Sequence, residues 1–183
     1  MSIKSGENRG KQKEKTIRRE FSAGGLVFKR KSKEVLWLIT NSSPSSLYPE
    51  PYWRLPKGWL DDSLNGKSPG PYALGVRKPT PGIVENAAIR EVQEEGGVNA
   101  KILKKVGTEK RFFVKEGKGV LKFITYYLME YISDNPSGFG YETSEVGWFT
   151  YDEARKNLKY PSEKKVLDEA KRILDSGLQE NLI

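Results

Sequence analysis

The chain has 183 residues, a net charge of +8 at pH 7, and neither histidine nor cysteine. The missing residue types exclude Ser-His-Asp and Cys-His nucleophilic sites, phosphohistidine chemistry, structural zinc, iron–sulfur clusters and disulfides. The length favours one domain with a sizeable core, and no apolar run approaches the roughly 18 residues of a membrane span. The positive charge favours polyanionic partners such as nucleotides or RNA.

Residues 1–19 form a polar, Gly- and Lys-rich segment with seven positive charges and no hydrophobic periodicity. This composition predicts a disordered basic arm, and the lack of an apolar h-region behind the charges argues against a secretory signal. We therefore expect a cytoplasmic protein with a folded domain over residues 20–183.

Two β-prone runs follow at residues 21–28 and 35–40, and the basic segment 29–34 separates them. This arrangement predicts a β-hairpin at the edge of a sheet. Gly24 and Gly25 lie inside the first run, where glycine marks a bulge or the close approach of a ligand.

Residues 41–80 are rich in Ser, Pro, Gly and Tyr, which predicts loops around one short strand at 52–55. Loops of such length are usually functional or disordered. The first clear helix is expected at 83–95, because Gly96 and Gly97 stop the pattern there.

The second half of the chain alternates strand and helix patterns. The sequence predicts strands at 100–106, 110–115, 119–132 and 145–150, and helices at 151–157 and 161–176. The order of these elements predicts the α+β class, with a mixed sheet sandwiched by helices.

Three carboxylates share one face of the predicted helix. Glu91, Glu94 and Glu95 stand at i, i+3 and i+4, so Glu94 and Glu95 each lie within about 60° of Glu91 around the helix axis. Like charges at these spacings oppose helix formation, so the cluster requires a compensating cation. Arg90 supplies one positive charge one turn before Glu94, and a divalent metal would neutralise the remainder.

Hard oxygen ligands without any His or Cys favour Mg²⁺, with Mn²⁺ as a substitute, over zinc or copper. Because Mg²⁺ is usually shared between a few carboxylates and substrate phosphates, the cluster indicates phosphate-ester or phosphoanhydride chemistry. A solvated acidic helix face is the alternative interpretation.

The segment Arg-Glu-Val-Gln-Glu-Glu-Gly-Gly-Val, residues 90–98, fits the second half of the Nudix hydrolase signature at every fixed position. Residues 55–59 resemble the Leu-Pro-Lys-Gly opening of that signature, and residues 85–91 resemble the start of its helix. The resemblance covers residues 20–175 in the expected order of elements and implies a Nudix-like fold.

The spacing of the two signature halves departs from the family pattern. The signature places its opening Gly fourteen positions before the Arg, whereas Gly58 and Arg90 lie 32 positions apart, which leaves an apparent insertion of 18 residues at 63–80. Counting back from Arg90 puts the family's first Glu at Gly82, so this ligand is missing. The unassigned substitutes are Asp61, Asp62 and Glu85.

The resemblance also implies roles for individual residues. The implied metal ligands are Glu91, Glu94, Glu95 and the backbone carbonyl of Gly58, and the implied catalytic residues are Glu91, Glu94, Arg90 and Glu145. Arg90 would orient the carboxylates. The general base must be a carboxylate because no imidazole exists, and either Glu145 or Glu142 takes this role, with a surface role as the alternative.

The Leu-Pro-Lys-Gly opening and the strand at 122–129 resemble the dinucleoside polyphosphate and diphosphoinositol polyphosphate pyrophosphohydrolases. Lys57 is then a phosphate contact, unless it is an ordinary exposed lysine. Tyr126 or Tyr127 offers a ring for stacking on a base, although alternation sends the two rings to opposite faces, where core packing competes. The basic run Lys110, Arg111, Lys115, Lys118 and Lys122 either holds a polyphosphate or guards a solvated edge.

The leading prediction is a Mg²⁺-dependent pyrophosphohydrolase of a nucleoside diphosphate-X substrate, such as a dinucleoside polyphosphate. The alternatives are a pyrophosphohydrolase of RNA 5′ ends, motivated by the basic arm, and a Nudix-like domain that binds nucleotides or RNA without hydrolysis. The expected partners are a nucleotide and RNA, without a membrane, and the chain is either a monomer or a homodimer.

Overall fold

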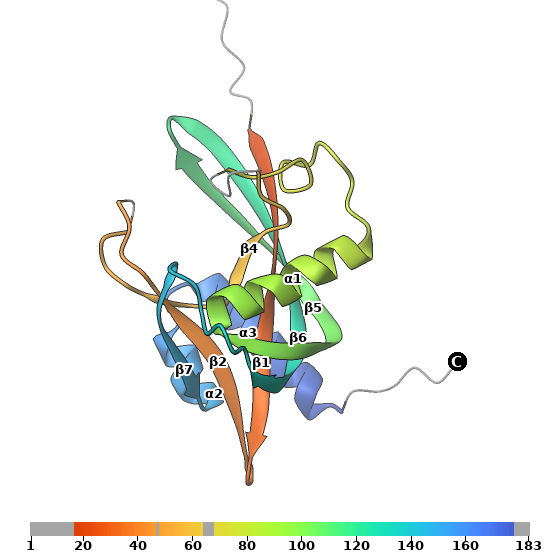
Figure 1. Cartoon of the computed structure of the whole chain (residues 1–183), viewed down its shortest axis with the longest axis vertical. Coiled ribbons are helices and arrows are strands. Elements are labelled where there is room, and N and C mark those ends of the chain that lie inside the picture. Colours follow the sequence, from red (N-terminus) through yellow and green to blue (C-terminus); the bar gives the residue numbers. More distant parts are fainter. Residues whose placement is uncertain (1–16, 47, 64–67, 178–183) are drawn as a thin grey trace, which may run out of the picture.

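The computed structural model describes residues 17–46, 48–63 and 68–177, which form a seven-stranded sheet with three helices (Figure 1). The predicted arm falls outside the described residues over 1–16. The elements are β1 (Arg18–Lys31), β2 (Glu34–Ser42), β3 (Trp53–Arg54), β4 (Lys57–Trp59), α1 (Pro81–Gly96), β5 (Val98–Lys115), β6 (Lys118–Asp134), β7 (Thr143–Phe149), α2 (Tyr151–Asn157) and α3 (Pro161–Asp175).

The sheet is mixed, as predicted. Its main path runs β3-β2-β1-β6-β5, with β4 paired to β1 and β7 paired to β2. The β1 and β6 strands are parallel, and the other strand pairs are antiparallel. The β1–β2 hairpin is confirmed, but its predicted place at the sheet edge is wrong. The parallel partner β6 occupies the other side of β1 and buries the hairpin inside the sheet.

Helices cover both faces of this sheet. One buried cluster contains Val27 of β1 and Val92 of α1, and a second contains Leu26 and Phe28 of β1 with Leu167 of α3. Successive residues of β1 thus point to opposite helices, as the period-two pattern of a strand requires. Figure 1 shows α1 in front of the sheet and α3 behind it, which is the predicted sandwich of helices.

The start of the domain differs slightly from the prediction. Arg18 pairs with Val120, and Arg19 pairs with Leu121. The two arginines therefore belong to β1 and not to the arm, because the long strand β6 extends far enough to pair with them.

Other strand boundaries also differ. The two strands predicted at 100–106 and 110–115 form the single strand β5, which absorbs the intervening irregularity as shifts of register. The single strand predicted at 52–55 is instead divided into β3 and β4. This division arises because β3 pairs with β2, whereas β4 pairs with β1.

Two glycines of β1 allow close packing of the protein against itself. A Cβ on Gly24 would lie 2.4 Å from the carbonyl oxygen of Pro56, and a Cβ on Gly25 would lie 2.5 Å from the side chain of Val92. Both distances are too short for real atoms. These glycines therefore bring β4 and α1 against β1, and the close approach predicted for a ligand is made by protein.

Helix α1 confirms the helix predicted at 83–95. The Thr80 hydroxyl accepts a hydrogen bond from the Ile83 N–H, and Pro81 occupies the first turn, where its missing N–H costs nothing. Gly97 ends the helix in the left-handed conformation, with φ of 65°. Within the described ranges, the chain contains no helix with the length and apolar character needed to cross a membrane.

The described part of the apparent insertion folds back onto the domain. The Asp61 carboxylate accepts hydrogen bonds from the backbone N–H groups of Tyr72 and Ala73, at 3.3 and 2.7 Å. The Phe21 N–H of β1 donates to the Ala73 carbonyl oxygen at 2.7 Å. Asp61 therefore anchors the insertion, and these contacts use the carboxylate that was a candidate for the missing ligand.

Candidate active site

A cavity of about 500 Å³ opens between β4, the C-terminal half of α1, β6 and the segment before β7. Its lining residues are Arg54, Lys57, Gly58, Trp59, Asp62, Glu91, Glu94, Glu95, Lys122, Gly140, Tyr141 and Glu142. The three helix glutamates, Lys57 and Gly58 therefore meet in one place, as the motif predicts. The lining also contains more carboxylates than cations, with five against three.

Strand β4 approaches α1 so closely that only glycine fits at its centre. A Cβ on Gly58 would lie 2.3 Å from the carboxyl carbon of Glu91. Arg90 joins the same two elements, because its Nη2 donates to the Trp59 carbonyl oxygen at 2.7 Å and to the Glu91 carboxylate at 2.7 Å. The conformation of the Glu91 side chain thus depends on Gly58 and on Arg90.

Glu91 is a buried carboxyl group with a strongly shifted pKa. Burial raises its pKa to about 8, and the negative charge of Glu95 adds to this effect. The adjacent Arg90 favours the charged form, but it opposes the shift only in part. In the absence of a metal, Glu91 therefore holds a proton near neutral pH.

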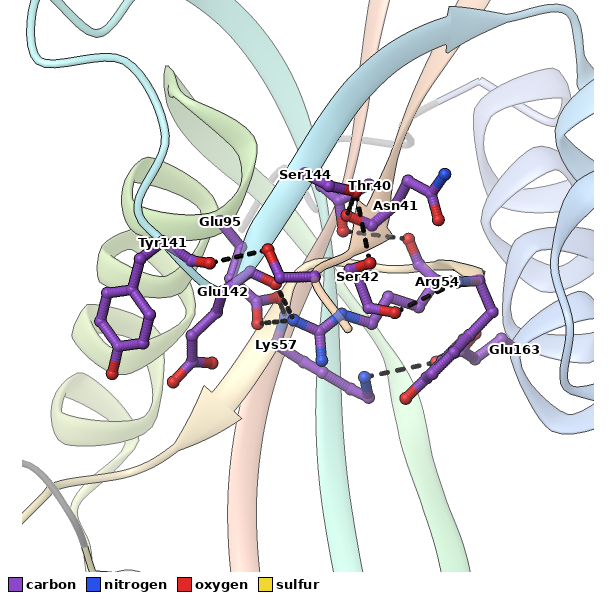
Figure 2. Close-up of polar contacts among 12 residues, drawn as sticks. Thr40, Asn41, Ser42, Arg54, Lys57, Glu95, Tyr141, Glu142, Ser144 and Glu163 are labelled. Carbon is purple, nitrogen blue, oxygen red and sulfur yellow. Dashed lines mark hydrogen bonds and ion pairs between the residues drawn. The ribbon is translucent and has the colours of Figure 1, made fainter. Parts of the chain in front are cut away.

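Glu95 lies next to Glu91, one turn further along α1, and is held from the opposite side of the cavity. Its carboxylate accepts hydrogen bonds from Arg54 Nη2 at 2.5 Å and from the Lys57 backbone N–H at 2.8 Å (Figure 2). Burial raises the pKa of Glu95, whereas the charges of Arg54 and Lys57 lower it. Arg54 also reaches the Glu142 carbonyl oxygen at 3.5 Å, so it connects β3, α1 and the segment before β7.

Glu94 is the accessible member of the cluster, since its side chain is 60% exposed and the Arg90 Nε lies 3.9 Å away. Among the described residues, no three acidic side chains are gathered into a ready-made metal cluster. Arg90 contacts the Glu91 carboxylate, and Arg54 contacts the Glu95 carboxylate. The donor set itself fits Mg²⁺, since the cavity offers only hard oxygen ligands and has an excess of negative charge.

Lys57 is held by a buried carboxylate on the far side of β4. Its Nζ lies 3.5 Å from Glu163, a fully buried residue of α3, and only 9% of the Lys57 side chain is exposed. Arg111 Nη2 lies 3.7 Å from the same carboxylate. Burial raises the pKa of Glu163, and both cations oppose that shift. Lys57 is therefore not an ordinary exposed lysine.

Lys122, one of the basic residues expected either to hold a polyphosphate or to guard a solvated edge, lines the cavity. Burial lowers its pKa to about 8, and the positive charge of Lys57 acts in the same direction. An anionic ligand in the cavity would favour the charged form of Lys122, which burial disfavours. The position of Lys122 in a strand of alternating character was the available signal, since β6 otherwise places apolar side chains on that face.

Two important residues, Arg54 and Glu163, were missed by sequence reasoning. Arg54 had a signal, because it is a cation within the short apolar segment that forms β3. Glu163 had none, since an acidic residue in the first turn of a helix is common for local reasons.

The structure does not place Glu145 in the cavity. Glu145 lies in β7 opposite Asn41 with an exposed side chain, whereas Glu142 lines the cavity. The bulge between Asn41 and Ser42 shifts the register at this end of β7. Of the substitutes for the missing ligand, Asp62 lines the cavity, and Gly82 lies in the first turn of α1, away from it.

The two tyrosines predicted to stack on a base are both core residues. Tyr126 is fully buried in the cluster beneath α3, and Tyr127 is buried in the cluster beneath α1. Alternation does send the rings to opposite faces, as predicted. Helices cover both faces at this point of β6, so neither ring is available to a ligand.

Gly58→Ala is expected to lower the rate of any reaction that depends on the carboxylates of this cavity by about 10-fold or more, because the new methyl group displaces the Glu91 carboxylate from its place beside Arg90. Gly107→Ala is the matched control, since a Cβ on Gly107 meets nothing within 4 Å. Steady-state rates of the two variants check this prediction. Equal rates would contradict it.

Comparisons with known proteins agree with this architecture. A family profile described as the NUDIX domain matches residues 18–170. A protein of Mycobacterium tuberculosis (strain CDC 1551 / Oshkosh), with the provisional name mutator protein MutT4, is 29% identical over 171 residues. The match covers 91% of this chain and 60% of that relative, so the chain spans about three fifths of the relative's length.

Solved structures share the fold at low sequence identity. A NUDIX hydrolase from Nitrosomonas europaea has a TM-score of 0.59 and 16% identity, over 85% of this chain and 90% of that one. A C. elegans Ap4A hydrolase in a binary complex has a TM-score of 0.56 and 19% identity, over 86% and 98% of the two chains. Since the family profile covers most of the chain, the chain belongs to the NUDIX family.

Proposed function

We propose that the protein is a Mg²⁺-dependent pyrophosphohydrolase of dinucleoside polyphosphates such as diadenosine tetraphosphate, acting in the cytoplasm. The observation that carries the proposal is the cavity, in which the carboxylates of the NUDIX helix face Arg54, Lys57 and Lys122. Carboxylates suit a divalent metal, and clustered cations suit a chain of phosphates. A long polyphosphate substrate needs both kinds of group.

The metal ligands in this proposal are Glu91, Glu94, Glu95 and the carbonyl oxygen of Gly58, with Mn²⁺ as a substitute for Mg²⁺. When bound, the metal lowers the pKa of water and neutralises phosphate oxygens. Its charge also matches the cavity, where carboxylates outnumber cations by two. Arg90 orients Glu91, as its hydrogen bond to that carboxylate supports.

Lys57 and Lys122 hold the phosphates in this proposal. Glu163 supports Lys57 from behind, so the ammonium group stays at the wall of the cavity without free rotation. The carboxylate of Glu142 accepts the proton of the attacking water, in place of Glu145, because Glu142 alone of the two lines the cavity. Adding water across the anhydride yields two phosphate products without any redox step.

Two further observations support the choice of substrate. The Leu-Pro-Lys-Gly opening resembles that of dinucleoside polyphosphate hydrolases, and a structure named as an Ap4A hydrolase shares the fold. The structural likeness concerns the fold alone.

The test is incubation of the purified protein with Mg²⁺ and a panel of diadenosine tetraphosphate, ADP-ribose, diphosphoinositol polyphosphate and triphosphorylated RNA. We expect cleavage of the dinucleotide to ATP and AMP, identified by mass. Glu94→Gln should lower this rate at least about 100-fold, because it removes one carboxylate charge from the metal site. Unchanged turnover in Glu94→Gln would overturn the metal site, and cleavage of another panel member alone would overturn the substrate.

An RNA 5′ end is the second candidate substrate, and the basic N-terminal sequence favours it. Five cations precede Ile17, and Arg18 and Arg19 follow in β1. If RNA is the substrate, deletion of residues 1–16 should weaken turnover of triphosphorylated RNA and reduce its salt dependence. Metal-dependent turnover of any panel member would exclude the third alternative, a domain that binds nucleotides or RNA without hydrolysis.

A further inference from the structure

The β5–β6 hairpin carries an exposed apolar patch at its tip. Ile17, Phe112 and Val114 are 58%, 60% and 65% exposed. Val114 pairs with Gly119 across the hairpin, and a Cβ on Gly119 would lie 3.1 Å from the Phe112 ring and 3.6 Å from Ile17. The three side chains therefore surround Gly119 as one surface, which we call the hairpin patch. Figure 1 shows this hairpin extending beyond α1 together with the start of β1.

Positive charge borders the hairpin patch. Arg19 and Lys110 are exposed, and Lys110 Nζ lies 6.0 Å from the centre of the Phe123 ring on the same face of the sheet. The turn at the tip contributes one acidic residue, Glu116. An aromatic ring among cations is therefore the chemical character of this surface.

We propose that the hairpin patch binds single-stranded nucleic acid. Phe112 offers a ring on which a base stacks, and the neighbouring Lys110 and Arg19 attract phosphates. A second copy of the chain is a poorer occupant, since pairing the patch with itself would place these cations against one another. Stacking is independent of base identity, so the surface is expected to bind without sequence preference.

The hairpin patch is separate from the cavity. Phe112 pairs with Leu121, and the next residue of β6, Lys122, lines the cavity. Because neighbouring residues of a strand point to opposite faces, the patch and the cavity lie on opposite faces of β6. Binding to the patch therefore requires no occupant in the cavity and goes beyond the proposed hydrolysis.

The test uses the full chain and a fluorescein-labelled oligouridylate of about 12 nucleotides with a 5′-hydroxyl end, measured by fluorescence anisotropy. This probe has no phosphoanhydride, so the hydrolytic site has no bond to act on. We expect Phe112→Ala to raise Kd about 5-fold or more through lost stacking. Lys110→Gln should reduce the slope of log Kd against log salt by about 0.7, the value for one phosphate contact on a single strand.

Two variants are matched controls. Ile132→Ala removes an exposed apolar side chain of β6 outside the hairpin patch, and Lys33→Gln removes an exposed charge in the β1–β2 turn. Both should bind the probe like the wild type. Circular dichroism should give the same melting temperature for Phe112→Ala as for the wild type, since the ring is exposed.

Three results would overturn the proposal. The first is no binding at low salt, the second is an unchanged Kd in Phe112→Ala, and the third is an equal loss in Ile132→Ala. Sedimentation that shows a dimer of the wild type and a monomer of Phe112→Ala, without probe binding, would instead assign the patch to a second copy. Each result is independent of hydrolysis, because probe binding is measured without turnover.

Discussion

Glu91→Gln is expected to stabilise the metal-free protein at pH 8.5 and at the same time to lower hydrolysis by at least about 100-fold. The pKa of Glu91 is about 8 in the folded protein, above its ordinary value of 4.5. Between these two values the folded state keeps the proton that the unfolded chain releases. The unfolding free energy of the wild type therefore falls as pH rises through this window and levels off above pH 8.

The amide of the Glu91→Gln variant resembles the protonated carboxyl, so it avoids this loss. The expected gain over the wild type at pH 8.5 is on the order of 2–4 kcal/mol, and it should vanish near pH 4.5. Urea unfolding with EDTA at both pH values measures it. Glu94→Gln is the matched control. Because the Glu94 side chain is exposed, this variant should lose hydrolysis without gaining stability. Equal destabilisation of Glu91→Gln at both pH values would contradict the buried proton.

Arg54→Met should lower the unfolding free energy by about 3–5 kcal/mol, because it leaves the buried Glu95 carboxylate without its charged partner. The Lys57 N–H still donates to Glu95, but one backbone hydrogen bond does not neutralise a buried charge. This pair also connects β3 to α1, so the loss should extend to the shape of the cavity.

The double variant Arg54→Met with Glu95→Gln should recover about half or more of that loss, since no unpaired charge remains. Urea unfolding of the wild type, both single variants and the double variant gives the coupling energy of the pair. Additive effects would show that Arg54 and Glu95 do not stabilise the fold as a pair.

Local sequence patterns predicted much of the fold. The helix at 83–95 was found because its stop at Gly96 and Gly97 is a property of the backbone itself. The glutamate spacing likewise predicted one shared face, since i, i+3 and i+4 are neighbours on any α-helix. The division of β5 into two predicted strands was wrong because bulges interrupt the pattern without interrupting the pairing.

The parts of the site that were missed depend on contacts between distant segments. Arg54 and Glu95 lie 41 positions apart, and Lys57 meets Glu163 only after α3 packs on the sheet. No local pattern links such pairs. Alternation correctly separated Tyr126 from Tyr127, but it does not tell whether a face is covered, and here helices cover both faces.

The parallel pairing of β1 with β6 also sets an order of events as the chain folds. Arg18 pairs with Val120, so a central strand waits for a partner synthesised roughly a hundred residues later. Such distant contacts form slowly, because closing the long loop costs entropy before the contact stabilises anything. β4 is held on β1, and Lys122 lies on β6, so the two walls of the cavity meet only after this pairing. A nascent chain therefore completes the sequence of its carboxylate helix well before it can enclose a substrate.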